Sequence, residues 1–344
     1  MKYVDIEAVE PGDILGKTIY AVNGTVLLSS NVQLTVFMIS TLRRIGVTNV
    51  YIKDASMQEM EEQEEILSEE TKVGIIKQMS ETMDSIRSGK DFNSRSISLT
   101  IEDLLFDVIR NKDVLVQLND IRTRDNAEYI HAMNVCMISS LLGVSLHLNQ
   151  VQLKELAIGA LLHDLGKPDL EADGENGDSK RHTWRGFELL KAKREFSLLI
   201  AHVAFQHHEH VDGTGEPRGL IGDQIHLYSR IVAVANTFDN LLTGDSEASR
   251  RLLPHEACEQ MMAMSGTRLD REILVHFMRI VSIYPNGVSV RLTTKETGIV
   301  VGQHRGLPGR PIVRVLQRES NDSLESREID LAKHTTVFIE QVLG

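Results

Sequence analysis

The spacing of the apolar residues predicts a mainly α-helical protein. From residue 100 to residue 283 these residues recur every three or four positions, which is the period of a helix with one buried face. We expect Thr100 to cap the first of these helices. The clearest stripe runs into His207 and consists of Phe196, Leu199, Ile200, Val203 and Ala204. Two polar loops, at 168–182 and 212–222, interrupt the helical pattern.

Both ends of the chain show shorter, strand-like patterns. A turn signal at Asn23-Gly24 predicts a hairpin, because Asn-Gly suits the tightest hairpin turns. Strands are expected at 14–20, 25–28, 47–52, 288–292, 298–301 and 312–316, with a short helix at 36–45. The resulting division has four parts: an N-terminal α+β module at 1–55, an acidic helix and linker at 56–99, a helical domain at 100–283, and a C-terminal β segment with a terminal helix at 284–344.

Residues 57–88 combine a run of glutamates with an apolar stripe at helical spacing. The stripe includes Val73, Ile76, Met79 and Met83. A solvated helix is the usual meaning of such a charge run. The alternative is a homodimer contact made through the apolar stripe.

Composition limits the classes of function. The 344 residues are 42% hydrophobic and 25% charged, which is ordinary for a soluble globular protein. The net charge of −12 argues against nonspecific nucleic-acid binding, so a polyanionic substrate would need a local positive site. The two cysteines, Cys136 and Cys258, predict reduced thiols and a cytoplasmic protein. The N-terminus does not resemble a signal peptide, and no apolar run reaches membrane-spanning length.

Two motifs at the ends of apolar helices suggest a metal site. His207 and His208 end one helix, and His163 and Asp164 end another. Neutral imidazoles suit borderline divalent metals, and a carboxylate that bridges two metals helps to activate water. The alternative for the histidine pair is a helix end that favours cationic side chains. Near Asp164, Gly166 permits a tight turn and Lys167 offers a cation for a phosphate.

Two further histidines complete the candidate set. His131 shares a helical face with Val135 and Ile138, and alone it would be a core histidine. His182 lies in the predicted polar loop 168–182, and alone it would be a surface residue. With the two motifs they give five imidazoles and one carboxylate within 78 positions. This set suits a two-metal site better than a structural zinc site, which closes with four ligands and favours cysteine.

These residues resemble the HD-GYP branch of the HD-domain metal-dependent phosphohydrolases. The resemblance covers roughly residues 100–318 and rests on His131, the run from His163 to Lys167, His182 and the stretch His207-His208-Glu209-x-x-Asp212-Gly213-x-Gly215-x-Pro217. It implies an all-helical domain with a buried di-iron or di-manganese site. The implied activity is the hydrolysis of bacterial cyclic dinucleotides, cyclic di-GMP above all, in signalling.

The resemblance also implies roles for individual residues. The metal ligands would be His131, His163, Asp164, His182, His207 and His208, with Asn236 as a weak extra ligand. Asp164 and Lys167 would carry the chemistry, with Lys167 holding a phosphate oxygen. Substrate contacts would come from Lys167, Arg185, Asp212, Gly213, Gly215 and Arg218.

The chain departs from the family pattern at several positions. Glu216 replaces the family's tyrosine, Asn236 stands where an aspartate ligand is usual, and Ala127 replaces a glutamate. The loop before His182 is also shorter than the family's. Asp239 could partly compensate for Asn236, with a structural cap or surface role as the alternative. These departures leave open a degenerate domain that binds a nucleotide or a signalling protein without turnover. An HD-type nucleotidase is a third reading, and the Asp-Gly-x-Gly-x-Pro loop argues against it.

Overall fold

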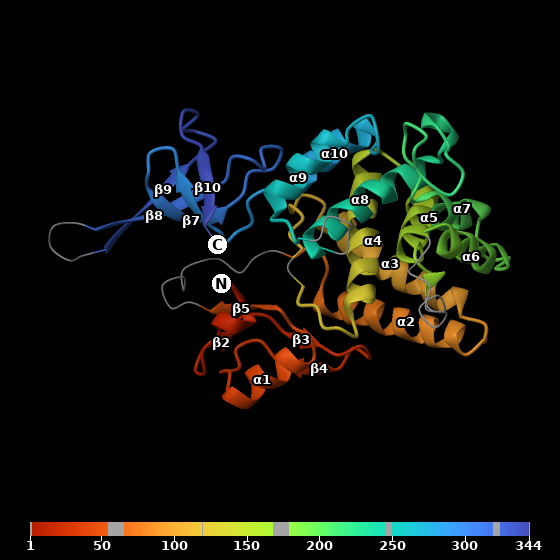
Figure 1. The fold of residues 1–344 in the computed structure, drawn as a ribbon, viewed down its shortest axis with the longest axis horizontal. Coiled ribbons are helices and arrows are strands. Elements are labelled where there is room, and N and C mark those ends of the chain that lie inside the picture. Colours follow the sequence, from red (N-terminus) through yellow and green to blue (C-terminus); the bar gives the residue numbers. More distant parts are fainter. Residues whose placement is uncertain are drawn as a thin grey trace.

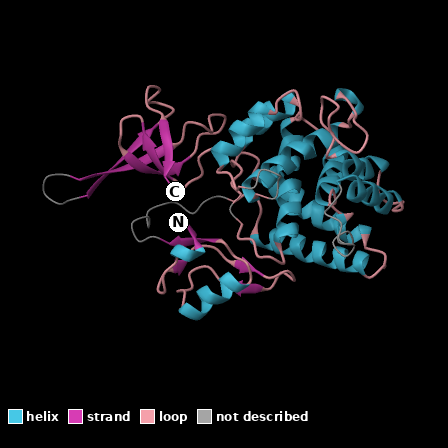
Figure 2. Ribbon diagram, in the orientation of Figure 1, coloured by secondary structure: helices cyan, strands magenta, loops and turns pink. Residues whose placement is uncertain are grey.

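A computed structural model of the chain describes residues 2–53, 65–118, 120–167, 179–244, 250–318 and 324–343. Figure 1 shows the helices α2–α10 gathered in one body, with the N-terminal module and the C-terminal sheet beside it. Figure 2 shows that the strands occur only in those two smaller parts of the described chain. The prediction of a mainly α protein with β structure at both ends is confirmed. Among the described residues, no helix has the length and apolar character needed to cross a membrane.

The N-terminal module has two small sheets and one helix. Its elements are β1 (Lys2–Asp5), the 3-10 helix η1 (Ile6–Ala8), β2 (Ile14–Leu15), β3 (Ile19–Tyr20), β4 (Val26–Leu28), α1 (Val36–Arg44) and β5 (Asn49–Lys53). The order β1-β5-β2 is antiparallel, and β3 pairs with β4 in the predicted hairpin. The single strand expected at 14–20 is two strands, because β2 pairs with β5 whereas β3 pairs with β4. Leu15, Ile19, Leu34 and Val50 fill the core of this module.

Helix α2 (Glu69–Arg87) joins the main helical core. Its predicted apolar stripe is inside the chain's own core, where Ile76, Met79 and Met83 are at most 4% exposed. These three side chains therefore offer no surface to a second copy, and the dimer contact predicted through them is wrong. The glutamates at 59–64 lie outside the described residues.

Helix α3 (Ser94–Arg110) begins six residues before the predicted cap. Asn93 caps it instead, since its Oδ1 accepts hydrogen bonds from the amides of Arg95 and Ser96 at 3.1 Å each. Thr100 lies inside the helix, and its hydroxyl donates to the carbonyl of Ser96. The first turn of α3 has few apolar residues, so a prediction based on the apolar stripe places the start of this helix too late.

The other helices pack around α4 (Ala127–Ser145), in which every residue from Tyr129 to Gly143 is buried. Such a helix, apolar on nearly all sides, is expected at the centre of a bundle. It contacts α2, α3, α5, α8 and α10. The remaining elements of this body are α5 (Gln150–Leu161), α6 (Ser179–Lys191), α7 (Leu198–Gln206), the 3-10 helix η5 (Gly222–Gln224), α8 (Leu227–Thr243), α9 (Pro254–Ala263) and α10 (Arg271–Ile280).

The C-terminal part is a five-stranded antiparallel sheet with the order β10-β6-β7-β8-β9. Its strands are β6 (Ser289–Leu292), β7 (Thr297–Gly302), β8 (Ile312–Arg318), β9 (Leu324–Asp330) and β10 (Ile339–Leu343). The predicted terminal helix is therefore wrong. The last described residues pair with β6, and the run from Thr335 to Ile339 is rich in β-branched and aromatic residues that favour strands.

Candidate metal centre

His163 and Asp164 lie in the turn that follows α5. A capping box between Asn149 and Gln152 starts this helix, and Leu162 ends it. The Nδ1 atom of His163 lies 2.8 Å from the carbonyl oxygen of Ala160, to which it donates a hydrogen bond. This bond leaves the lone pair of Nε2 available as a metal ligand. His163 is fully buried, as expected for a residue that continues an apolar helix.

His207 and His208 follow α7, with His207 as its C-cap. The Nδ1 atom of His207 lies 2.9 Å from the carbonyl oxygen of Ala204, so its Nε2 is also available. The ring centroids of His207 and His208 are 4.1 Å apart, and that of His182 lies 5.1 Å from that of His208. The expectation that the two histidines end an apolar helix is confirmed.

His182 lies in the first turn of α6 rather than in a loop. Gly166 explains its place, because a Cβ atom added there would lie 2.0 Å from the carbonyl oxygen of His182 and 2.8 Å from the amide nitrogen of Gly186. The turn after Asp164 and helix α6 thus approach each other as only a glycine allows. Residues 179–182 of the predicted loop 168–182 are helical, and residues 168–178 lie outside the described chain.

The carboxylate of Asp164 lies at the centre of these imidazoles. Its Oδ2 is 3.2 Å from His163 Nε2 and 3.6 Å from His131 Nε2. Its Oδ1 is 3.4 Å from His182 Nε2 and 3.5 Å from His207 Nε2. Each oxygen therefore faces a different pair of histidines, which is the arrangement of a bridging carboxylate.

The ligand atoms form two groups that share Asp164. One group is His131, His163 and Asp164, and the other is Asp164, His182, His207 and His208. In each group the atoms lie within 4.8 Å of one another. The Oδ1 atom of Asp164 is buried and accepts no hydrogen bond from any described residue. An unsatisfied buried carboxylate oxygen among neutral imidazoles fits a divalent cation.

The protonation states suit metal binding. Burial lowers the pKa of His182 to about 3 and also lowers the pKa values of His207 and His208. Burial opposes ionisation of Asp164, but His163 and Lys167 outweigh it and hold the pKa of that carboxyl well below its usual range. Neutral imidazoles around an ionised carboxylate are the forms that bind metals.

Lys167 lies beside the carboxylate, with its Nζ 2.5 Å from Asp164 Oδ2. Its role in holding a phosphate oxygen stays a prediction. In this arrangement the ammonium group is paired with the carboxylate, and a substrate phosphate would compete with Asp164 for it.

Asp239 of α8 is fully buried and lies against the Nδ1 side of the His131 ring. Its Oδ2 lies 2.6 Å from His131 Nδ1, and its Oδ1 accepts hydrogen bonds from Asn134 Nδ2 at 2.9 Å and Arg122 Nη2 at 2.5 Å. Burial opposes ionisation of this carboxyl, but Arg122 and His131 hold its pKa well below the usual range. The cap or surface role considered for Asp239 is wrong, and sequence reasoning missed Arg122 altogether.

Asn236 lies one helical turn before Asp239 and is also buried. Its Oδ1 accepts a hydrogen bond of 3.0 Å from Asn240 Nδ2. The described contacts do not include one between Asn236 and the histidines, so its role as a ligand stays a prediction.

The predicted nucleotide loop is held by a residue that sequence reasoning did not single out. Glu209 is buried, and its two carboxylate oxygens accept hydrogen bonds from the amides of Arg218 at 2.8 Å and Leu220 at 2.9 Å. Gly215 packs on this segment, where an added Cβ atom would lie 2.1 Å from the amide nitrogen of His210. The signal available in the sequence was an acid between His208 and His210, within the stretch that carries the family resemblance.

The other predicted contact residues lie on the surface of this loop. Asp212 is exposed and binds the amide and hydroxyl of Thr214, at 2.9 Å and 2.6 Å. Gly213 has a positive φ of 85°, which favours glycine, and the Arg218 side chain is exposed. Their contact with a nucleotide stays a prediction.

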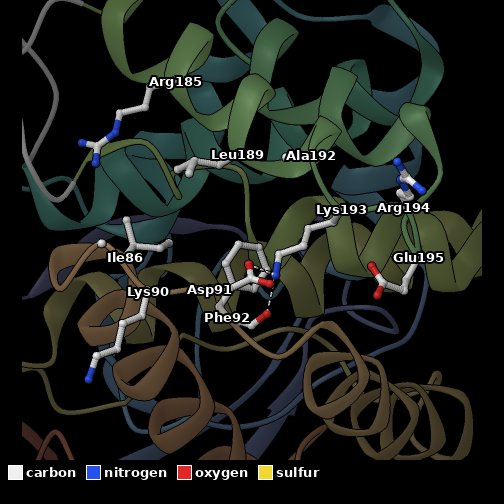
Figure 3. Close-up of a pocket in the computed structure, with 11 residues that line it drawn as sticks. Ile86, Lys90, Asp91, Phe92, Arg185, Leu189, Ala192, Lys193, Arg194 and Glu195 are labelled. Carbon is white, nitrogen blue, oxygen red and sulfur yellow. Dashed lines mark hydrogen bonds and ion pairs between the residues drawn. The ribbon is translucent and has the colours of Figure 1, made fainter.

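Arg185 links the site to a neighbouring cavity. Its Nη1 lies 3.4 Å from the carbonyl oxygen of Gly166, close to Asp164 in the chain. A cavity of about 540 Å³ lies between α6 and the connection from α2 to α3, and Arg185 lines one end of it (Figure 3). None of the histidines lines this cavity, so it is separate from the metal centre.

Comparisons with known proteins identify the family. Residues 111–273 match the family model described as HD domain, and residues 289–344 match that of the KOW domain associated with HD domain. A cyclic di-GMP phosphodiesterase of Pseudomonas aeruginosa is 30% identical over an alignment of 258 residues that covers 72% of this chain and 62% of that protein. A cyclic di-GMP phosphodiesterase of Thermotoga maritima is 29% identical over an alignment of 190 residues that covers 52% of this chain and 50% of that protein.

The matched part of the chain thus spans less than two thirds of either relative. A solved structure of a Bdellovibrio bacteriovorus protein, described as an HDG"Y"P protein, shares the fold with a TM-score of 0.50 and 16% identity, over 80% of this chain and 97% of that one. Residues 111–273 of the chain therefore form an HD domain, and the resemblance noted in the sequence is confirmed by this match and by the relatives named as cyclic di-GMP phosphodiesterases.

Proposed function

We propose that this protein is a metal-dependent phosphodiesterase that hydrolyses a cyclic dinucleotide, cyclic di-GMP first of all, in bacterial signalling. The observation that carries the proposal is Asp164, whose two oxygens face two separate groups of histidines. The relatives named above as cyclic di-GMP phosphodiesterases support the choice of substrate.

His131, His163, Asp164, His182, His207 and His208 would hold two divalent metals, with Asn236 as a weaker extra ligand. An all-N/O ligand set without cysteine favours iron or manganese. Two such ions would activate water and offset the charge that develops on the phosphate during hydrolysis. Two buried, unpaired cysteines agree with the predicted cytoplasmic location, which belongs to the same proposal.

The residues of the chain would bind and orient the substrate. The ammonium group of Lys167 would move from Asp164 to a phosphate oxygen of the substrate. The carboxylate and the phosphate are both anionic, so they would compete for this one ammonium group. Arg185 would add a second positive charge beside Gly166. The loop with Asp212, Gly213, Gly215 and Arg218 would contact the nucleoside part of the substrate.

Asp164→Ala tests the proposal directly. We expect between one and two metal ions per chain in protein purified without chelator, and we expect the substitution to lower metal content and abolish cyclic di-GMP hydrolysis. Asp103→Ala is the matched control, because Asp103 is an exposed carboxylate on α3. Near-zero metal after anaerobic reconstitution of the wild type, or unchanged turnover in Asp164→Ala, would refute the proposal.

The second candidate is a domain that binds the nucleotide or a signalling protein without turnover. The neutral Asn236 and Glu216 in place of the family's tyrosine favour it. Wild-type protein that binds two metals and cyclic di-GMP but releases no product over hours would select this candidate.

A further inference from the structure

The segment between α3 and α4 belongs to two cores at once. Ile121 is 7% exposed and packs in the hydrophobic core of the N-terminal module. The next residue, Arg122, turns the other way and binds Asp239 of α8. Two adjacent side chains thus join the N-terminal module to the buried carboxylate behind the metal centre.

The backbone of the same segment is fixed to the module. The amide of Arg124 donates to the carbonyl of Ile45 at 3.0 Å, and Asn126 Nδ2 donates to the carbonyl of Tyr20 at 3.0 Å. Asn126 is fully buried, and its Oδ1 accepts a hydrogen bond from the amide of Thr123 at 2.7 Å. The position of Arg122 therefore depends on α1, β3 and the turn that follows α1.

On the other side, Arg122 completes the surroundings of Asp239. This carboxylate has one oxygen on His131 Nδ1 and the other on Arg122 and Asn134. It is fully buried, and the Arg122 side chain is 19% exposed. Without the guanidinium group, an anion buried between α4 and α8 would lose its cationic partner, and its position against His131 would change.

Residues that hydrogen-bond a metal-ligating histidine fix its tautomer and orientation, and their loss weakens metal binding. We propose that Arg122 and Asp239 are positioning residues for His131, and that the N-terminal module sets their position through residues 121–126. The module then controls the affinity of the metal subsite formed by His131, His163 and Asp164. This inference rests on the metal centre of the proposed function and not on its substrate.

Manganese titration of metal-free protein tests the inference without any nucleotide. Arg122→Ala should weaken Mn²⁺ binding at one of two sites about ten- to a hundredfold, and Arg122→Lys should restore part of the affinity because it keeps the charge. Arg124→Ala is the matched control, because the Arg124 side chain is exposed. Its contact with Ile45 is made by the backbone amide, which the substitution keeps. Circular dichroism establishes that each variant is folded.

Should Arg122→Ala fail to fold, the double variant Arg122→Ala/Asp239→Asn removes both charges and keeps a hydrogen-bonding group beside His131. It should fold and still bind Mn²⁺ about tenfold or more weakly at that site. Wild-type affinity in a folded Arg122→Ala would overturn the role of Arg122, and wild-type affinity in the double variant would overturn the role of both residues.

The link to the module needs a separate pair of variants. Ile121→Ala opens a cavity in the core of the N-terminal module and should weaken Mn²⁺ binding at the same site. Leu292→Ala removes a buried side chain from the C-terminal sheet and should lower stability alone. Equal Mn²⁺ affinity in Ile121→Ala and wild type would overturn the control by the module.

The two proposals fail in different ways. A wild type that binds Mn²⁺ but has no phosphodiesterase activity contradicts only the enzymatic function, and the comparison of variants still decides the role of Arg122. A wild type that binds no Mn²⁺ refutes both.

Discussion

At the scale of single residues, the geometry of the metal centre depends on which ring nitrogen of each histidine is already hydrogen-bonded to the protein. The Nδ1 atoms of His131, His163 and His207 bind a carboxylate or a carbonyl, so their Nε2 atoms face Asp164. Asp164 divides its two oxygens between two groups of ligands. Because the two groups share only Asp164, the site can lose affinity for one metal and still bind the other. A substitution at Asn236, the predicted weak ligand, therefore tests how many metals the native site binds.

Asn236→Asp should raise the number of metals bound per chain toward two. A carboxylate adds charge and still accepts the hydrogen bond from Asn240 Nδ2, so the isosteric change should leave α8 intact. If the native site is only weakened, cyclic di-GMP hydrolysis should rise as well. The measurement is metal stoichiometry together with hydrolysis in variant and wild type.

Asn23→Asp controls for the added charge, because Asn23 uses its Oδ1 only to accept from Thr25 in the exposed hairpin turn. Less metal in Asn236→Asp than in the wild type would contradict the place of Asn236 among the ligands.

The buried histidines predict how the stability of metal-free protein depends on pH. Burial places the folded pKa of His182 at about 3 and lowers the pKa values of His207 and His208 below 6.5. Below pH 6.5 the unfolded chain therefore binds protons that the folded chain does not, and the free energy of unfolding falls as the pH drops. The melting temperature in the presence of a chelator should be lower at pH 5 than at pH 7.

His182→Gln removes one of these groups and keeps a neutral polar side chain. The fall in melting temperature between pH 7 and pH 5 should be smaller in this variant. An equal or larger fall would contradict the assignment of a neutral, buried His182.

At the scale of elements, the place of α6 depends on one close approach. Gly166 in the turn after α5 lies against the backbone of His182 and Gly186, and a methyl group there would meet backbone atoms rather than a flexible side chain. Gly166→Ala should therefore destabilise the fold by about 1–3 kcal/mol or more and displace His182 from Asp164. Urea unfolding and metal content measure the two effects.

Gly74→Ala is the control for this substitution, since Gly74 lies within α2 and an added Cβ atom there would have no neighbour within 4 Å. It should stabilise the protein by about 0.5–1 kcal/mol. Similar losses in both variants would show that the contact at Gly166 is not special.

Elements with an apolar stripe could be predicted from the sequence, and those placed by distant partners could not. The stripe that ends at His207 gave the end of α7 correctly. The first turn of α6 is polar, so His182 was expected in a loop, whereas its packing against α7 makes it helical. Likewise, β10 finds its partner β6 about fifty residues earlier, and no local pattern reveals that pairing.

The residues of the candidate site also fall into those that could be predicted from the sequence and those that could not. The five histidines and Asp164 could be found because they occur in recognisable motifs. Asp239 and Arg122 could not be assigned, because they are 117 positions apart and each resembles an ordinary charged residue until the fold brings them together.

At the scale of the whole molecule, the described residues form three hydrophobic clusters, which correspond to the N-terminal module, the helical body and the C-terminal sheet. The helical body contains the whole candidate metal centre. The N-terminal cluster includes Ile121, which comes from beyond α3, so its core is not made from a continuous stretch of the chain. The helical cluster includes residues on both sides of position 100, and apart from Ile121 position 55 lies between the N-terminal and helical clusters, so the four-part division stays a prediction.

The adjacent residues Ile121 and Arg122 bear on how the N-terminal module could be exchanged for another one by protein engineering. A foreign module joined anywhere before residue 100 would inherit Ile121 without the pocket that receives it, and would expose an apolar side chain next to the arginine. A functional fusion would have to carry its own match for Ile121, or replace the segment 121–126 together with the module. Because α2 and α3 belong to the core of the helical body, the module and the segment 121–126 would have to be exchanged as two separate pieces of the chain.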